Sequence, residues 1–201
     1  MSVFPDTPAM LLARLAAAAT GEAEDDWTRF FAQYEPVIRR FAASLGAFSD
    51  SEDVAQEIFR RLVEVFRAGT FRPERGRFRA YLAAMIRNEV VNRWHRARAR
   101  AAGRTLSLDD DAFPLEVGVP SDTPARIDAR WRAACEAAAV EHVLTRTALS
   151  ARSRAIYRAY VLEGGAIDAV ARRFGVSNNA VSQVKTRVTR MIAAYLMAFD
   201  A

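Results

Sequence analysis

Apolar residues recur at steps of three and four positions along two long stretches of the chain, the spacing of one face of an α-helix. No stretch shows the alternating pattern of a β-strand or the turn of a hairpin. The pattern predicts helices at about Pro8–Ala18, Trp27–Leu45, Phe78–Arg100, Trp131–Leu149, Ser150–Glu163, Ile167–Phe174 and Asn178–Ala194. A further helix, which Ser49 or Asp50 can cap, carries the apolar stripe Val54–Phe66 and ends at Gly69. The sequence therefore predicts an all-α fold.

Charge divides the chain into segments. Residues 76–104 carry a net charge of +7, residues 105–127 one of −4, and residues 128–201 one of +5. The acidic segment also contains Pro114, Pro120 and Pro124 and has no sustained helical period. We therefore predict a short helical N-terminal extension (1–25), a first helical domain (26–104), an acidic proline-containing linker (105–127) and a second helical domain (128–201). The alternative for 105–127 is a long surface loop within one domain.

The composition indicates the kind of partner and the compartment. Of the 29 basic residues 28 are arginine, and the net charge is +5, which suits an anionic partner: nucleic acid, an anionic membrane or an acidic protein. One cysteine and two distant histidines predict no disulfide, no metal centre and no other cofactor. The apolar run Ala9–Ala19 is short and interrupted by Arg14, so we expect no signal sequence, no membrane span and a cytoplasmic protein.

The helix expected at Phe78–Arg100 has two contrasting faces. Leu82, Ile86 and Val90 recur at helical spacing, and the same spacing assigns Tyr81 and Trp94 to the core. The other face is almost entirely arginine. Such a face can follow a phosphate backbone.

The last two expected helices form a helix-turn-helix pattern. A small residue, Ala171, stands where the helices cross, Gly175 provides the turn, and Ser177 is the expected N-cap of the second helix. The exposed face of that helix carries amides, which can bind adenine edges, and cations, which can bind guanine or phosphate. Its candidate DNA-binding residues are Asn178, Asn179, Ser182, Gln183, Lys185, Thr186, Arg187 and Arg190. Helical hairpins that never bind DNA share much of this pattern.

These motifs resemble a known family. The segments DSEDVAQEIFR (50–60), GRFRAYL (76–82) and IRN (86–88) are similar to region 2 of the extracytoplasmic-function (ECF) sigma factors. The helix-turn-helix and its two preceding helices resemble region 4 of the same family. The resemblance covers roughly 27–100 and 136–192, in the order that the family has.

The resemblance implies a transcription initiation factor that binds core RNA polymerase, through its clamp helices and flap, and promoter DNA in duplex and single-stranded form. By similarity, the face of Asp53, Gln56, Glu57 and Arg60 docks on the clamp helices. Asn88 and the loop Gly69–Gly76 form a pocket for a flipped base of the minus-10 element. The residues implied in minus-10 binding are Arg87, Asn88, Asn92, Arg93, Arg96 and Arg100. The second domain is implied to bind the minus-35 element, the linker to follow the RNA exit path, and an anti-sigma factor is a further partner that the family allows.

Two other classes of function are weighed against this interpretation. A stand-alone dimeric helix-turn-helix regulator would bind a twofold-symmetric duplex site without polymerase. An enzyme acting on nucleic acid would need a phosphate-binding loop, a metal set or a nucleophile elbow, and none occurs in the sequence. We therefore expect a protein that acts by binding and is not an enzyme.

Overall fold

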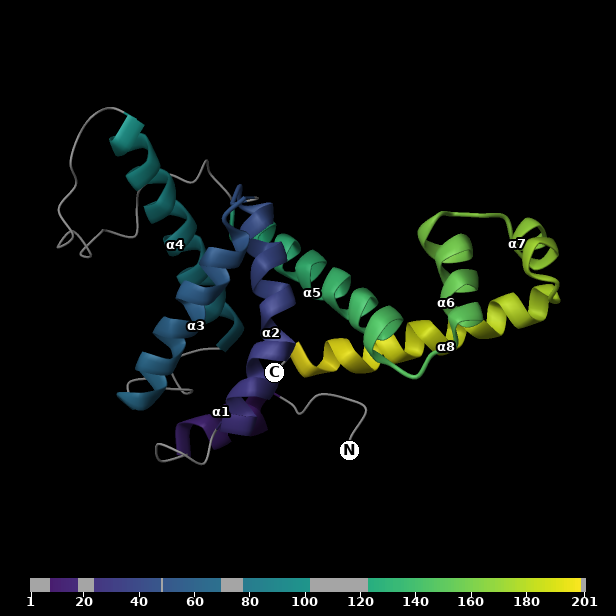
Figure 1. Ribbon diagram of the computed structural model, residues 1–201, viewed down its shortest axis with the longest axis horizontal. Coiled ribbons are helices and arrows are strands. Elements are labelled where there is room, and N and C mark those ends of the chain that lie inside the picture. Colours follow the sequence, from purple (N-terminus) through teal and green to yellow (C-terminus); the bar gives the residue numbers. More distant parts are fainter. Residues whose placement is uncertain (1–7, 18–23, 48, 70–77, 102–122, 200–201) are drawn as a thin grey trace. The chain divides into compact units, whose positions relative to one another are not determined.

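The computed structural model describes residues 8–17, 24–47, 49–69, 78–101 and 123–199. All regular elements in these ranges are helices (Figure 1), so the all-α prediction is confirmed. The α-helices are α1 (Pro8–Ala17), α2 (Glu24–Ser44), α3 (Ser51–Arg67), α4 (Phe78–Ala101), α5 (Pro124–Arg146), α6 (Ala151–Tyr157), α7 (Ile167–Phe174) and α8 (Asn178–Leu196). A π-helical turn, η2 (Arg158–Leu162), continues α6, and a 3-10 turn, η3 (Met197–Phe199), follows α8.

The chain divides into two compact units, and the boundary falls inside α5, between Ala134 and Cys135. The N-terminal unit holds α1 to α4 with the first turns of α5, and the C-terminal unit holds the rest. The expected linker lies outside the described residues up to position 122, and its last residues, from Pro124, are helical. Helix α5 therefore begins seven positions before the predicted Trp131, because Pro124 starts a helix here instead of preventing one.

In the N-terminal unit, α2, α3 and α4 pack against one another around a fully buried apolar core. Each helix contributes one apolar stripe: Phe30, Ile38 and Phe41 from α2, Ile58 and Leu62 from α3, and Leu82 and Ile86 from α4. The start of α5 joins this core through Trp131, which is 2% exposed and whose ring lies 5.3 Å from that of Phe41. Helix α1 is anchored by its buried leucines and by an ion pair of 2.9 Å between Arg14 and Asp26.

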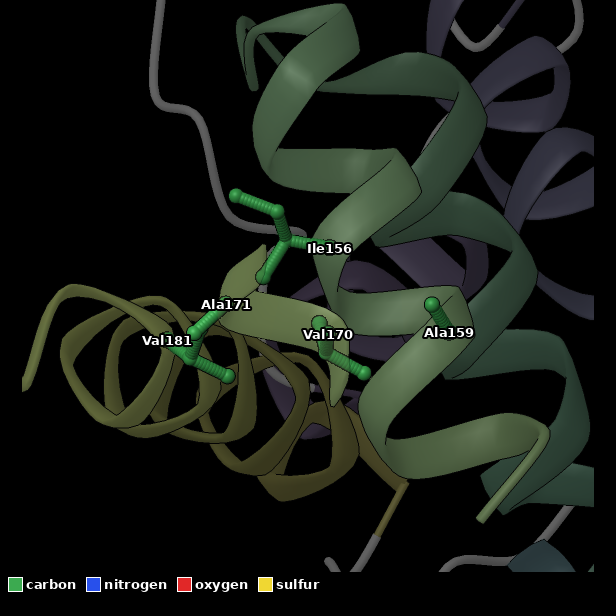
Figure 2. Close-up of a cluster of buried hydrophobic side chains, with 5 residues drawn as sticks. All are labelled: Ile156, Ala159, Val170, Ala171 and Val181. Carbon is green, nitrogen blue, oxygen red and sulfur yellow. The ribbon is translucent and has the colours of Figure 1, made fainter. Parts of the chain in front are cut away.

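The C-terminal unit has a small core of its own. Figure 2 shows its buried side chains gathered between α6, η2, α7 and α8: Ile156, Ala159, Val170, Ala171 and Val181. At its edge, Gly165 approaches the preceding helix so closely that an added Cβ would lie 2.7 Å from the carbonyl oxygen of Ala159. Small residues where η2, α7 and α8 meet let these short helices pack closely, and this packing fixes the orientation of α8 within the C-terminal unit.

Candidate nucleic-acid and protein interfaces

The four α3 residues implied in polymerase docking share the solvent face of the helix. Their neighbours Val54, Ala55, Ile58 and Leu62 form the buried face. The side chains of Asp53 and Arg60 are 69% and 56% exposed, Gln56 is exposed, and Glu57 is 22% exposed. The α3 docking face, defined as Asp53, Gln56, Glu57 and Arg60, is therefore accessible to a protein partner.

The N-terminus of α3 differs from the prediction that Ser49 or Asp50 caps it. Asp50 occupies the N-cap position but makes no side-chain capping hydrogen bond. Its carboxylate instead accepts a hydrogen bond of 2.8 Å from the Ser49 hydroxyl. The side-chain pair replaces the cap that either residue was predicted to supply.

Arginines hold Glu57 in its charged form. Arg60 donates to both carboxylate oxygens of Glu57, at 2.7 and 2.9 Å, and Arg61 donates to one of them at 2.7 Å. The hydrogen bonds from Arg60, followed by those from Arg61, lower the pKa of Glu57 to about 2 although burial opposes the shift. The same pairing raises the pKa of Arg60. The centre of the docking face is thus a fixed carboxylate between two guanidinium groups.

The residues implied in minus-10 binding lie along α4. Asn88, Asn92 and Arg96 follow one another at four-residue steps, so they share one face of the helix, and Asn88 and Arg96 are exposed. Arg87 and Asn92 are half-buried. Arg100 belongs to the last turn, but its side chain is outside the described part, as is the expected base pocket at 70–76.

Arg93 is already engaged within the N-terminal unit. Its Nε donates to Glu89 at 2.7 Å, its Nη2 donates to the backbone oxygen of Asp53 at 3.2 Å, and its Nη1 lies 3.8 Å from the Asp53 carboxylate. Arg93, a member of the predicted minus-10 set, therefore contacts α3 directly.

The prediction from helical spacing that Trp94 and Tyr81 lie in the core is wrong. Trp94 is 52% exposed and Tyr81 is 36% exposed. In α4 no described side chain after Val90 is buried, so the later positions of the apolar stripe have no core to enter. The Trp94 ring lies 5.1 Å from the ring of His95, and the Arg98 guanidinium lies 5.4 Å from its centroid.

The apolar spacing did not predict a role for Glu89, which entered only the net charge of residues 76–104. Its side chain is 1% exposed, and each carboxylate oxygen pairs with a different arginine: Arg61 at 2.9 Å and Arg93 at 2.7 Å. The available signal was its position, three residues after Ile86 and seven after Leu82, on the apolar face. An acid at such a position requires cationic partners when the helix packs.

The C-terminal unit presents α8 with its polar face outward. Gly175 adopts a left-handed conformation (φ 60°) that ends α7, and the Ser177 side chain caps α8 by accepting from the Ala180 amide at 3.2 Å. All eight predicted DNA-binding residues of α8 are exposed, whereas Val181 and Val188 are buried. Asn178 donates to Asp168 at 2.5 Å, and the Lys185 ammonium lies 5.6 Å from the Tyr160 ring centroid.

The described residues offer neither a metal site nor a membrane span. These ranges contain no group of three or more His, Cys, Asp or Glu side chains placed to hold a metal ion. None of the helices in these ranges is both long enough and apolar enough to cross a membrane.

Comparison with known proteins gives one family match. Residues 30–100 match the family model described as Sigma-70 region 2, and no curated protein matches the chain. The matched segment contains the α3 docking face and nearly all of α4. A sigma-70 region 2 domain implies binding to core RNA polymerase and promoter DNA, and its family consists of transcription initiation factors, not of enzymes. Residues 30–100 are therefore similar to sigma-70 region 2, and this similarity supports a member of the sigma-70 family.

Proposed function

We propose that this protein is an ECF-type sigma factor that directs core RNA polymerase to minus-35 and minus-10 promoter elements. The observation that carries the proposal is the region 2 match over 30–100, because it coincides with the docking face on α3 and the cationic helix α4. The ECF type is supported by the sequence motifs and by the two helical units, the second ending in the helix pair α7 and α8.

In this proposal the α3 docking face binds the clamp helices of core polymerase. The face is exposed and holds its carboxylate and guanidinium groups in a fixed pattern through the Glu57 pairs. A partner with complementary charges can bind such a pattern without first ordering it, which lowers the entropic cost of association.

Helix α4 contributes the minus-10 contacts. The face of Asn88, Asn92 and Arg96 supplies amides for an unstacked base and a cation for the backbone. The exposed indole of Trp94 adds a flat apolar surface on which a base can stack. A protein that binds separated strands better than duplex shifts the opening equilibrium toward the melted state, so melting needs no nucleotide hydrolysis.

Helix α8 contributes the minus-35 contacts from its eight exposed polar and basic residues. Because Ser177 and Gly175 fix its N-terminal end and Val181 and Val188 fix its buried face, the opposite face is free to enter a major groove. The flap of core polymerase is a further proposed contact of this unit, and an anti-sigma factor is a further proposed partner.

The test combines core binding with promoter selection. The purified chain and bacterial core RNA polymerase are incubated with a random duplex library, and the recovered sequences are used as templates in run-off transcription. We expect co-migration with core and transcripts that start at one distance from a selected two-part sequence. If the chain fails to bind core but selects a twofold-symmetric site alone, it is a dimeric helix-turn-helix regulator and the proposal is wrong.

Asn88→Ala separates the two activities of the region 2 domain. The side chain is exposed on α4 and is not part of the α3 docking face, so the variant is expected to keep core affinity and to form fewer open complexes. Permanganate reactivity of the selected promoter measures opening. Unchanged opening would remove Asn88 from the site.

A further inference from the structure

A chain of ion pairs crosses from α3 to α4 within the N-terminal unit. From the α3 docking face it runs from Arg60 to Glu57 (2.7 Å), from Glu57 to Arg61 (2.7 Å), from Arg61 to Glu89 (2.9 Å) and from Glu89 to Arg93 (2.7 Å). It ends on the first turn of α3, where Arg93 contacts Asp53. Both ends of the chain therefore belong to the docking face, and its middle lies in α4.

Glu89 is the element of this chain that bridges the two helices inside the protein. The side chains of Arg61 and Arg93 are 29% and 28% exposed, but that of Glu89 is only 1% exposed. One oxygen of Glu89 accepts a hydrogen bond from Arg61 and the other accepts one from Arg93, so the two arginines occupy different sites on the carboxylate. A carboxylate removed from water in this way is retained only with both partners in place, because an unpaired buried charge is strongly unfavourable.

We propose that Glu89 is a positioning residue that holds Arg93 and α4 in the orientation needed for minus-10 DNA and couples that orientation to the α3 docking face through Arg61. The inference rests on the proposed function, which assigns α3 to polymerase and α4 to DNA. Glu89 itself contacts neither, since it is buried beneath both faces.

The geometry explains how the coupling acts on DNA. An arginine has five N–H donors, and Arg93 uses one on Glu89 and one on the backbone of Asp53. Glu89 thereby sets the direction of the guanidinium plane while further donors remain for a phosphate. If Arg61 is removed, Glu89 is held from one side only, and the orientation of Arg93 is no longer tied to α3.

Arg61 offers the decisive variant because it belongs to neither predicted contact set and is partly exposed. The test measures three quantities for Arg61→Gln, Glu89→Gln, the double variant and the parent: thermal midpoint, affinity for core polymerase, and affinity of the holoenzyme for a single-stranded oligonucleotide. The oligonucleotide carries the non-template strand of the minus-10 sequence selected above. Ile86→Val is the matched control, since Ile86 is fully buried one turn earlier in α4 and carries no charge.

We expect Arg61→Gln to weaken oligonucleotide binding about tenfold in the parent and by less than about twofold in the Glu89→Gln background. The second effect is smaller because residues in one ion-pair network contribute non-additively. Core affinity is measured separately because Arg61 also pairs with Glu57 of the α3 docking face, and the oligonucleotide is titrated into holoenzyme in which the chain is saturated with core. Ile86→Val should lower the thermal midpoint and leave oligonucleotide affinity unchanged. If Glu89→Gln does not fold, the comparison of Arg61→Gln with Ile86→Val still tests the inference. A network that only stabilised the fold would make both variants lose the same oligonucleotide affinity for the same loss of thermal midpoint.

Additive effects of Arg61→Gln and Glu89→Gln, or a loss of DNA binding in Ile86→Val as large as that in Arg61→Gln, would overturn the inference while leaving the proposed function intact. A parent protein that binds neither core nor the oligonucleotide would overturn both.

Discussion

Replacing Trp94 by alanine is expected to weaken binding of melted DNA with little effect on folding. The indole is 52% exposed, and its ring contacts are with His95 and with the Arg98 guanidinium. An exposed cation–π pair contributes about 0.5–1 kcal/mol. We therefore expect Trp94→Ala to lower the free energy of unfolding by no more than about 1 kcal/mol.

The effect on DNA follows from what an exposed ring can do. Stacking of a base on an aromatic side chain contributes about 1–3 kcal/mol. Since each 1.4 kcal/mol is a factor of about ten, Trp94→Ala should weaken single-strand binding by about 5- to 150-fold. Trp94→Phe retains a ring and should recover most of the affinity.

The assay is fluorescence anisotropy of the holoenzyme with the single-stranded minus-10 oligonucleotide, alongside thermal unfolding of each variant. Trp131→Phe is the matched control, because Trp131 is 2% exposed in the core of the same unit. It should lower the thermal midpoint and spare DNA affinity, the reverse of Trp94→Ala. Binding by Trp94→Ala within about twofold of the parent would refute the stacking role, as would an equal loss in Trp94→Phe.

Three further predictions follow from single contacts. The pKa of Glu57 in the folded chain, about 2, lies below its ordinary value of 4.5, so the charged form stabilises the fold at neutral pH and this contribution is lost as the pH falls from about 4.5 to about 2. After allowance for solvent screening of the exposed Arg60, we expect the charged form of Glu57 to contribute about 1 kcal/mol to the free energy of unfolding. Urea unfolding of the parent and of Glu57→Gln at several pH values across that range measures this contribution. If the two free energies of unfolding change with pH in parallel, the prediction is wrong. Gly165→Ala places a Cβ 2.7 Å from the Ala159 carbonyl oxygen and should destabilise the C-terminal unit by about 1–3 kcal/mol, and an unchanged melting curve would show that the helices part freely. Arg187→Ala should weaken duplex binding and lower the slope of log affinity against log salt by about 1, whereas an unchanged slope would place Arg187 away from phosphate.

Helix positions were largely predictable because the apolar spacing reports directly on which face packs. The observed start of α4 at Phe78 and of α8 at Asn178 agree with the predicted starts, and Ser177 caps α8 as expected. The start of α5 was not predicted. Prolines in the acidic segment indicate a linker, but a proline at the first helical position is compatible with a helix, and only packing distinguishes the two.

The site residues show where spacing alone fails. Trp94 continues the stripe of Ile86 and Val90, yet it is exposed because the core ends before the helix does. Glu89 is the converse case: an acid on an apolar face that is buried because Arg61 approaches from another helix. Neither the length of the core nor a partner 28 residues away can be read from local periodicity.

Run-off transcription with purified core RNA polymerase decides whether this protein confers promoter specificity. We expect no specific transcript from core alone, and one transcript from the selected two-part promoter once the chain is added. Transcription that is unchanged by the chain, with no co-migration of chain and core, would contradict this expectation.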